Sequence, residues 1–406
     1  MKKTKAAPML EFADALEKLK QATLPYQQTE VETLSLSMLV GRVLAEDIRS
    51  TINVPPADNS AMDGYAIHTS SVSALPTTLN VSQKIAAGSK PAQLAPGTAA
   101  RIFTGANIPK GANCVVIQEN CDSDATTVTL NSGVSERGNI RKLGQDIKSN
   151  EIIFNKGRRV KAQDIGLLAS IGIQSALVYK RIRVAILSTG NELIQPGNAL
   201  KEGQIYDSNR PMVETICREL CCDISASIHI QDNLKTTTDA LTQLSKTSDM
   251  IISCGGVSVG DEDHLKQAVS NIGALALWKV KIKPGKPIAF GEISRDKQKP
   301  CLFLGLPGNP VSAFVTLHLF GKLVISVMQG MSKNITSEFE YKADFTTTGN
   351  NKRPEFLRVK CTQNGLTPYS NQSSGVLSSV CWADALAFIP ENTAINEGDT
   401  LKVYPI

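Results

Sequence analysis

The second half of the chain alternates short apolar strands with amphipathic helices, and this alternation restricts the possible folds more than any other feature of the sequence. The pattern predicts strands at Arg183–Leu187, Ile224–Ile230, Met250–Cys254 and Cys301–Leu304. The helices predicted between and after them are Arg210–Leu220, Thr236–Leu244, Asp263–Ile272 and Pro310–Met328. Strands and helices that alternate in this way are typical of a parallel, doubly wound α/β sheet.

The segments on either side of this region follow other patterns. Residues 9–22 and 164–173 have helical spacing, whereas short β-branched runs separated by turn residues fill the chain from about 50 to 150. Beyond Ser337 apolar and polar residues alternate, which indicates half-buried strands in a small barrel or sandwich. A chain of 406 residues is also too long for a single hydrophobic core. We therefore expect an α/β plus β protein of several domains.

Charge, hydropathy and cysteine usage exclude several classes of protein. The formal net charge of +5 is too small and too dispersed to indicate nucleic-acid binding. The first ten residues lack a signal-peptide pattern, and the apolar stretch Ala313–Met328 is interrupted by His318 and Lys322, so it predicts a buried helix and no membrane span. The nine cysteines are irregularly spaced, which is typical of reduced core thiols. We expect a soluble cytoplasmic protein.

Three of the predicted parallel strands end in glycine-rich loops, at Leu187–Leu193, Ser253–Asp263 and Gly305–Ser312. The carboxyl ends of parallel strands meet at one edge of a sheet, so these loops should converge. Glycine lets backbone N–H groups approach a ligand, and helix N-termini attract negative charge, so the loops favour a phosphate or another oxyanion. Their spacing matches neither a P-loop nor a dinucleotide fingerprint. Tight-turn geometry is the alternative explanation for any one of these loops.

Carboxylates lie in or near the same loops, at Glu192, Asp232 and Asp263. Carboxylates next to a phosphate would repel it unless a cation lay between them, and hard oxygen ligands with phosphate indicate Mg²⁺. Asp263 also fits a helix N-cap, and Asp232 also fits an ordinary turn residue.

A lysine-rich segment follows, in which Lys279, Lys281 and Lys283 alternate as they would on one face of a strand. A Pro-Gly-Lys-Pro turn comes directly after them, so Lys283 and Lys286 could share a small pocket that suits a tetrahedral oxyanion. A solvated edge strand explains the alternation equally well.

The β-rich region between 50 and 150 carries two further motifs. Asp58–Ala66 holds two carboxylates, Asp58 and Asp63, among small residues, and Phe103–Ala106 places the Thr104 hydroxyl beside a glycine. Either aspartate could simply form an Asx turn.

Six motifs together resemble the MoeA-type molybdopterin molybdenumtransferases, a family that includes the E domain of gephyrin. The motifs follow the family order from about residue 9 to the C-terminus: Asp58–Ala66, Phe103–Ala106, Ser188–Leu193, Gly255–Asp261, Lys283–Pro287 and Gly305–Ser312. The resemblance implies four domains. These are a discontinuous helical linking domain (8–50 and 145–180), an inserted β-rich domain (51–144), a three-layer α/β molybdopterin-binding domain (181–332) and a C-terminal β-barrel (333–406).

The same resemblance implies an activity. Family members cleave adenylyl-molybdopterin with Mg²⁺, release AMP and insert molybdate into the dithiolene, which yields the molybdenum cofactor. They are homodimers whose site lies between the α/β domain of one subunit and the β-rich domain of the other. The resemblance also implies transient contacts with the molybdopterin adenylyltransferase and with recipient molybdoenzymes, and no nucleic-acid or membrane partner.

Site residues can be carried over from the family one position at a time. The resemblance implies catalytic roles for Asp63, Thr104, Glu192, Asp232 and Asp263, of which all but Thr104 could hold the metal. The positions implied to bind molybdopterin or molybdate are Gly255, Gly256, Ser258, Lys279, Lys283, Lys286, Pro287, Pro307, Asn309, Pro310, Ser312, Arg353 and Ser374. The chain has Asn191 and Gln145 where the family commonly has acidic residues, which reduces the acidic charge near the implied metal.

Two other functions remain compatible with these motifs. A molybdopterin adenylyltransferase shares the α/β domain and a similar Gly-Gly-Val-Ser loop, but such enzymes are generally far shorter. A scaffold protein without activity could also use this fold, since gephyrin anchors receptors.

Overall fold

A six-stranded sheet forms the centre of the main domain in the computed structural model, which describes residues 9–255, 264–285, 287–296, 298–332 and 338–406. From one edge to the other, the strands are β16 (Asp223–Ile230), β13 (Arg183–Thr189), β17 (Met250–Cys254), β20 (Cys301–Leu306), β19 (Pro287–Ile293) and β18 (Gly273–Lys279). The first four are parallel, as predicted. β19 and β18 run antiparallel to their neighbours, so the sheet is mixed and not wholly parallel.

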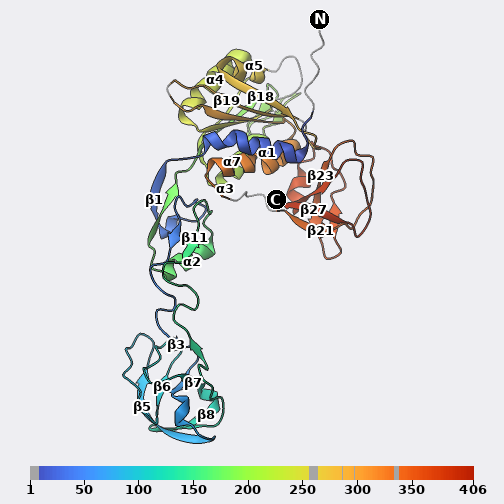
Figure 1. Ribbon diagram of the computed structural model, residues 1–406. Helices are drawn as coiled ribbons and strands as arrows, with labels where there is room; N and C mark the ends of the chain where they lie inside the picture. The colour runs from blue at the N-terminus through green and yellow to red at the C-terminus, as the bar shows by residue number, and fades with distance from the viewer. Residues whose placement is uncertain (1–8, 256–263, 286, 297, 333–337) are drawn as a thin grey trace.

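Helices cover both faces of this sheet and make three layers (Figure 1). α4 (Leu234–Thr247) and α5 (His264–Ile272) cover one face, while α1 (Phe12–Thr23), α3 (Asn209–Glu219), α6 (Pro310–Thr316) and α7 (Lys322–Met328) cover the other. Along β13, Val184 and Ile186 pack in one core and Ala185 and Leu187 in the other, because neighbouring side chains of a strand point to opposite faces. Coverage of both faces explains why the central strands are apolar throughout.

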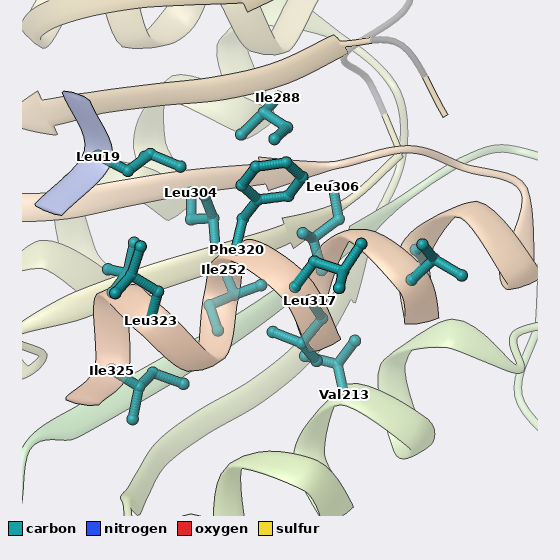
Figure 2. Packing of buried hydrophobic residues seen from close by; sticks show 14 of the residues in the cluster. Leu19, Val213, Ile252, Ile288, Leu304, Leu306, Leu317, Phe320, Leu323 and Ile325 are labelled. Carbon is teal, nitrogen blue, oxygen red and sulfur yellow. The ribbon is translucent and has the colours of Figure 1, made fainter. Parts of the chain in front are cut away.

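The predicted helix Pro310–Met328 is continuous but contains a π-helical turn, Leu317–Gly321, between α6 and α7. Phe320 of this turn points toward the sheet and packs close to Ile252 and Leu304 (Figure 2). By length and composition the helix could cross a membrane, but 89% of its apolar window is buried inside the fold. The expectation of a buried core helix agrees with this packing.

A narrow arm leads away from the main domain (Figure 1). It contains α2 (Ala162–Ser170) and two small antiparallel ladders, formed by β1 (Val31–Ser35) with β12 (Ser175–Tyr179) and by β2 (Ile48–Arg49) with β11 (Ile152–Phe154). Leu39, Leu44, Leu168 and Val178 form its own hydrophobic core. Because the arm is built from two stretches far apart in sequence, the chain passes along it outward and then back.

The β-rich domain at the end of the arm contains a second six-stranded sheet. Its strands, in spatial order, are β7 (Cys114–Ile117), β4 (Gly64–Ile67), β6 (Thr98–Ile102), β5 (Thr77–Ile85), β9 (Thr127–Leu130) and β8 (Cys121–Ser123). A short ladder of β3 (Asn59–Ser60) and β10 (Ile140–Arg141) lies where this domain meets the arm (Figure 1). This domain therefore lies at the opposite end of the molecule from the main sheet.

The C-terminal domain contains a curled five-stranded sheet, in the order β21 (Phe339–Lys342), β27 (Thr400–Pro405), β25 (Ala385–Ile389), β23 (Glu355–Cys361) and β24 (Leu366–Pro368). A bridge between Ala343 and Leu366 brings its two outer edges together, as in a small barrel. β22 (Thr347–Thr348) pairs with β26 (Ala394–Ile395), and the short helix α8 (Ser378–Trp382) precedes β25. Phe12 of α1 contacts the rings of Phe356, Phe388 and Tyr404, which ties this domain to the main one.

Candidate functional site

A cavity of about 760 Å³ lies at the carboxyl ends of β13, β17 and β20. Thr189 and Gly190 from the end of β13, Cys254 and Gly255 from the end of β17, and the loop after β20 form its walls. The convergence predicted for the strand-end loops is therefore present among the described residues. A fourth wall, Arg353 and the segment 372–374, comes from the C-terminal domain.

An acidic wall of the cavity carries two carboxylates, Glu192 from the loop after β13 and Asp232 from the loop after β16. The Asp232 backbone N–H donates to Asn191 Oδ1 at 3.2 Å, which joins the two loops. Gly190 has φ +152°, a backbone conformation that residues with a side chain rarely adopt, so this position favours glycine. The described residues include no group of three His, Cys, Asp or Glu side chains arranged for a metal. Asp263, the third predicted carboxylate, lies outside the described residues.

Another part of the lining is basic and is formed by the segment 283–285 together with Arg353. Lys283 lines the cavity, and Arg353 Nη1 donates to the Ile282 and Gly285 carbonyls at 2.9 and 3.4 Å. Gly285 has φ +98°, which a residue without a side chain adopts easily and which allows the tight turn. It lies beside Ser312. Lys286 lies outside the described residues, and so does the side chain of Pro287.

The three alternating lysines do not share one strand face, contrary to the prediction from their spacing. β18 ends at Lys279, which is exposed and does not line the cavity. Lys281 forms ion pairs with Glu11 and Glu391, and only Lys283 reaches the cavity. The reason is that β18 turns back into the antiparallel strand β19, so the chain leaves the extended conformation before Lys283.

The loop after β20 and the start of α6 form the floor of the cavity. Four of the positions implied to bind molybdopterin or molybdate line it: Pro307, Asn309, Pro310 and Ser312. Asn309 Nδ2 donates to Ser374 Oγ at 3.1 Å, and the Val311 N–H donates to the Ser374 carbonyl at 3.1 Å. Ser374, which also lines the cavity, therefore holds the C-terminal domain against the first turn of α6. Gly255 lines the cavity too, whereas Gly256 and Ser258 lie outside the described residues.

Asp63 and Thr104 form a pair of their own, far from this cavity within one chain. Asp63 Oδ1 accepts hydrogen bonds from the Thr104 N–H at 2.7 Å and from Thr104 Oγ1 at 2.8 Å, and these bonds lower the pKa of Asp63. Both residues belong to the β-rich domain at the end of the arm, next to β3 and β6 (Figure 1). One chain alone therefore does not bring them to Glu192 and Asp232.

Sequence reasoning missed a buried ion pair behind the cavity wall. Asp207 is 2% exposed and accepts hydrogen bonds from Ser188 Oγ at 2.6 Å and from Arg210 Nε at 3.0 Å. Two residues further on, Asn209 lines the cavity and donates to the Gly308 carbonyl at 2.7 Å. An aspartate three residues before Arg210, at the start of a helix, is a capping signal that could have identified this position.

The cavity also contains a thiol, that of Cys254, but no activated nucleophile follows from it. The Cys254 side chain is buried, and burial raises its pKa far above the ordinary value. A protonated thiol is a poor nucleophile, since the thiolate is the reactive form. The chemistry available from the described residues is therefore charge neutralisation and positioning, by the carboxylates Glu192 and Asp232 and the cations Lys283 and Arg353.

Three family models match successive parts of the chain. They are described as the MoeA N-terminal region (domains I and II) over residues 10–172, a probable molybdopterin binding domain over 185–326, and the MoeA C-terminal region (domain IV) over 341–406.

Individual relatives agree with these models. A Haemophilus influenzae protein named molybdopterin molybdenumtransferase is 38% identical over 312 residues, which is 76% of each chain. A Nostoc protein of the same name is 31% identical over 392 residues, which is 93% of this chain and 89% of that one. Among solved structures, a molybdopterin biosynthesis MoeA protein from Pyrococcus horikoshii has a TM-score of 0.82 and 26% identity, and the match covers 98% of this chain and 100% of that one.

Proposed function

The chain belongs to the family of MoeA-type molybdopterin molybdenumtransferases, and from this premise we propose that its main cavity is where molybdate is inserted into molybdopterin during molybdenum cofactor synthesis. The observation that carries the proposal is the composition of the cavity. Glu192 and Asp232 lie on one wall, and Lys283 and Arg353 on another, in a space of about 760 Å³. Such a cavity suits the binding of a substrate with a phosphoanhydride together with a separate oxyanion.

In this proposal the substrates are adenylyl-molybdopterin and molybdate. Lys283, Lys286, Pro287 and Ser312 surround the molybdate, and Arg353 and Ser374 complete its pocket from the C-terminal domain. The glycine-rich loop with Gly255, Gly256 and Ser258 receives the molybdopterin end, with Pro307, Asn309 and Pro310 beneath it. Lys279 contributes positive charge from the end of β18. Cleavage of the anhydride releases AMP as molybdate enters the dithiolene.

The acidic wall fits a magnesium ion. Mg²⁺ usually takes one or two carboxylates in proteins and completes its octahedron with waters and substrate phosphates, and Glu192 and Asp232 both line the cavity. We propose that these two, with Asp263 and with Asp63 of a second copy, are the residues that hold it. When bound, Mg²⁺ would neutralise charge on the anhydride. Cys254 supplies no thiolate for a covalent intermediate. The role proposed for the residues of the chain is therefore to orient the anhydride relative to the molybdate.

We further propose that the active form is a homodimer in which Asp63 and Thr104 of one copy face the cavity of the other. The distance between the two ends of the molecule in Figure 1 supports this, because Asp63 and Thr104 can meet the cavity only from another chain. Apolar side chains are exposed at both places: Met62 next to Asp63, and Ile205 in the lining of the cavity. Exposed apolar groups of this kind are typical of surfaces that become covered.

The remaining parts of the proposal concern the setting of the reaction. We propose that the enzyme acts in the cytoplasm, since all nine cysteines are free and free thiols are typical of a reducing compartment. The adenylyltransferase of the preceding step and the recipient molybdoenzymes are its proposed transient partners. The ranges 8–50 with 145–180, 51–144, 181–332 and 333–406 are the proposed domains.

A direct assay distinguishes this function from its two rivals. The purified chain is incubated with adenylyl-molybdopterin, molybdate and Mg²⁺ in the absence of ATP, and AMP and active cofactor are measured. Release of AMP with formation of cofactor supports molybdenum insertion. Formation of adenylyl-molybdopterin from ATP and molybdopterin would support the adenylyltransferase, and absence of both activities in a folded protein would support a scaffold.

A further inference from the structure

Lys283, a cation that lines the cavity, is paired with a carboxylate from the C-terminal domain. Lys283 Nζ lies 2.8 Å from Glu355 Oε1, at the first residue of β23. The lysine side chain is half exposed, whereas the glutamate side chain is only 13% exposed. No motif in the sequence pointed to Glu355. An acidic group therefore lies directly behind a residue that we propose to bind an anion.

The backbone fixes this pair in place. Residues Lys283 and Glu355 form a parallel bridge in which the Lys283 N–H donates to the Pro354 carbonyl at 2.9 Å and the Phe356 N–H donates to the Lys283 carbonyl at 2.8 Å. Arg353 adds its bond to the Ile282 carbonyl. These main-chain bonds hold Lys283 and Glu355 side by side, so the carboxylate stays within reach of the ammonium group.

A second cation also interacts with this carboxylate. Arg358, three residues further along β23, is fully buried and interacts electrostatically with Glu355. Its guanidinium donates to Ser379 Oγ at 3.2 Å and to the Phe356 carbonyl at 3.3 Å, both neutral groups. Glu355 therefore has two cations among its electrostatic partners, the Lys283 ammonium and the Arg358 guanidinium.

We infer that Glu355 competes with the oxyanion for the Lys283 ammonium and thereby sets the affinity of the cavity for oxyanions. This inference rests on the proposed role of Lys283 in molybdate binding. An oxyanion that uses Lys283 approaches to within roughly 6 Å of the Glu355 carboxylate, where repulsion between like charges is substantial in a partly buried site. While the cavity is empty, the ion pair holds Lys283 in position. When an oxyanion arrives, it must share or replace the carboxylate.

Equilibrium binding of molybdate alone tests the inference, with isothermal titration calorimetry on the full-length protein. Glu355→Gln keeps the shape of the side chain and removes its charge, so it should lower the Kd for molybdate about tenfold. The matched control is Glu338→Gln, since Glu338 belongs to the same domain, pairs with Lys402 at 3.0 Å and does not line the cavity. This control should leave the Kd unchanged.

A double-mutant cycle identifies Lys283 as the group for which the two anions compete. Lys283→Met alone should raise the Kd for molybdate, and adding Glu355→Gln to Lys283→Met should change it by less than about twofold. Thermal unfolding checks that each variant is folded, and Glu355→Ala replaces Glu355→Gln, with the same expected direction, if the glutamine variant does not fold.

Three results would overturn the inference. One is an unchanged or higher Kd in folded Glu355→Gln, which would mean that Glu355 orients Lys283 and does not compete with the anion. Another is an equal gain in affinity with and without Lys283. A third is a folded wild-type protein that binds no molybdate, and this result alone would also remove the oxyanion site from the proposed function.

Discussion

At the scale of single residues, the cavity depends on charged groups whose surroundings differ sharply. Glu192 and Asp232 line an open cavity, and Lys283 is half exposed, so these groups are accessible to a ligand. Asp207 and Arg210 lie behind the wall, with side chains only 3% and 16% exposed. Exposed groups at the cavity are therefore expected to affect catalysis, and the buried pair is expected to affect stability.

Replacement of Glu192 tests the acidic wall. Glu192→Gln should reduce the rate of AMP release from adenylyl-molybdopterin by about 100-fold, because it removes a charged oxygen ligand from the proposed Mg²⁺ site. The apparent affinity for Mg²⁺ should fall in the same titrations. Glu202→Gln is the matched control, since Glu202 is exposed and does not line the cavity. A rate within about twofold of wild type in Glu192→Gln would contradict the proposed metal site.

Replacement of Asp207 tests the buried pair. Asp207→Asn should lower the free energy of unfolding by about 2–4 kcal/mol, because it leaves the Arg210 guanidinium without its counter-charge in a buried position. Asp223→Asn removes an exposed ion pair with Arg181 and should cost no more than about 0.5 kcal/mol. Chemical denaturation of the two variants measures the difference. Equal losses of unfolding free energy in the two variants would mean that burial does not increase the contribution of the Asp207–Arg210 pair to stability.

At the scale of elements, the π-helical turn between α6 and α7 places a histidine in the core. His318 is 3% exposed, and burial lowers its pKa from 6.5 to about 3, with a smaller contribution from nearby Lys322. The ring stacks on Phe314 with centroids 5.7 Å apart. The native state therefore contains a neutral imidazole at pH values where the unfolded chain would bind a proton.

This difference predicts how stability depends on pH. The pKa of His318 is lower in the folded than in the unfolded state, so its neutral form is fully stabilising above pH 6.5, and stability falls as the pH is lowered from 6.5 toward 3. The contribution to the slope approaches about 1.4 kcal/mol per pH unit. His318→Leu should flatten the pH dependence of the unfolding temperature between pH 6.5 and 5, whereas His68→Gln, at an exposed histidine, should not. A slope unchanged by His318→Leu would show that other groups account for it.

At the scale of the whole molecule, the elongated shape separates the two sets of proposed site residues. Figure 1 places the β-rich domain at one end of the arm and the main sheet at the other. In the proposed arrangement a complete site requires two copies, and each copy of a dimer would contribute to two sites. This arrangement makes a specific prediction about mixtures of variants.

Complementation between inactive variants tests the trans arrangement. Asp63→Ala and Glu192→Gln should each lose nearly all activity as homodimers. Co-expression should restore about a quarter of wild-type AMP release, because half of the dimers are mixed and each mixed dimer has one intact site. Light scattering gives the oligomeric state, and Asp63→Ala co-expressed with Asp63→Ala is the control. No recovery in mixed dimers that demonstrably form would contradict the shared site.

Much of this molecule can be predicted from local sequence patterns. The strands β13, β16, β17 and β20 and their helices follow from hydrophobic periodicity, and the meeting of Gly190, Gly255 and Pro307 follows from the parallel direction of the strands. Both inferences use only neighbours in the sequence and a general property of parallel sheets.

Contacts between distant segments were decided by the tertiary structure alone. The antiparallel return of β18 into β19 directs Lys281 away from the cavity and Lys283 into it, although their spacing suggested one shared face. The wall at 372–374 and the Lys283–Glu355 pair arise because the C-terminal domain packs on the main one. Such contacts depend on how separately folded surfaces fit together, and no periodicity within a single segment encodes that fit.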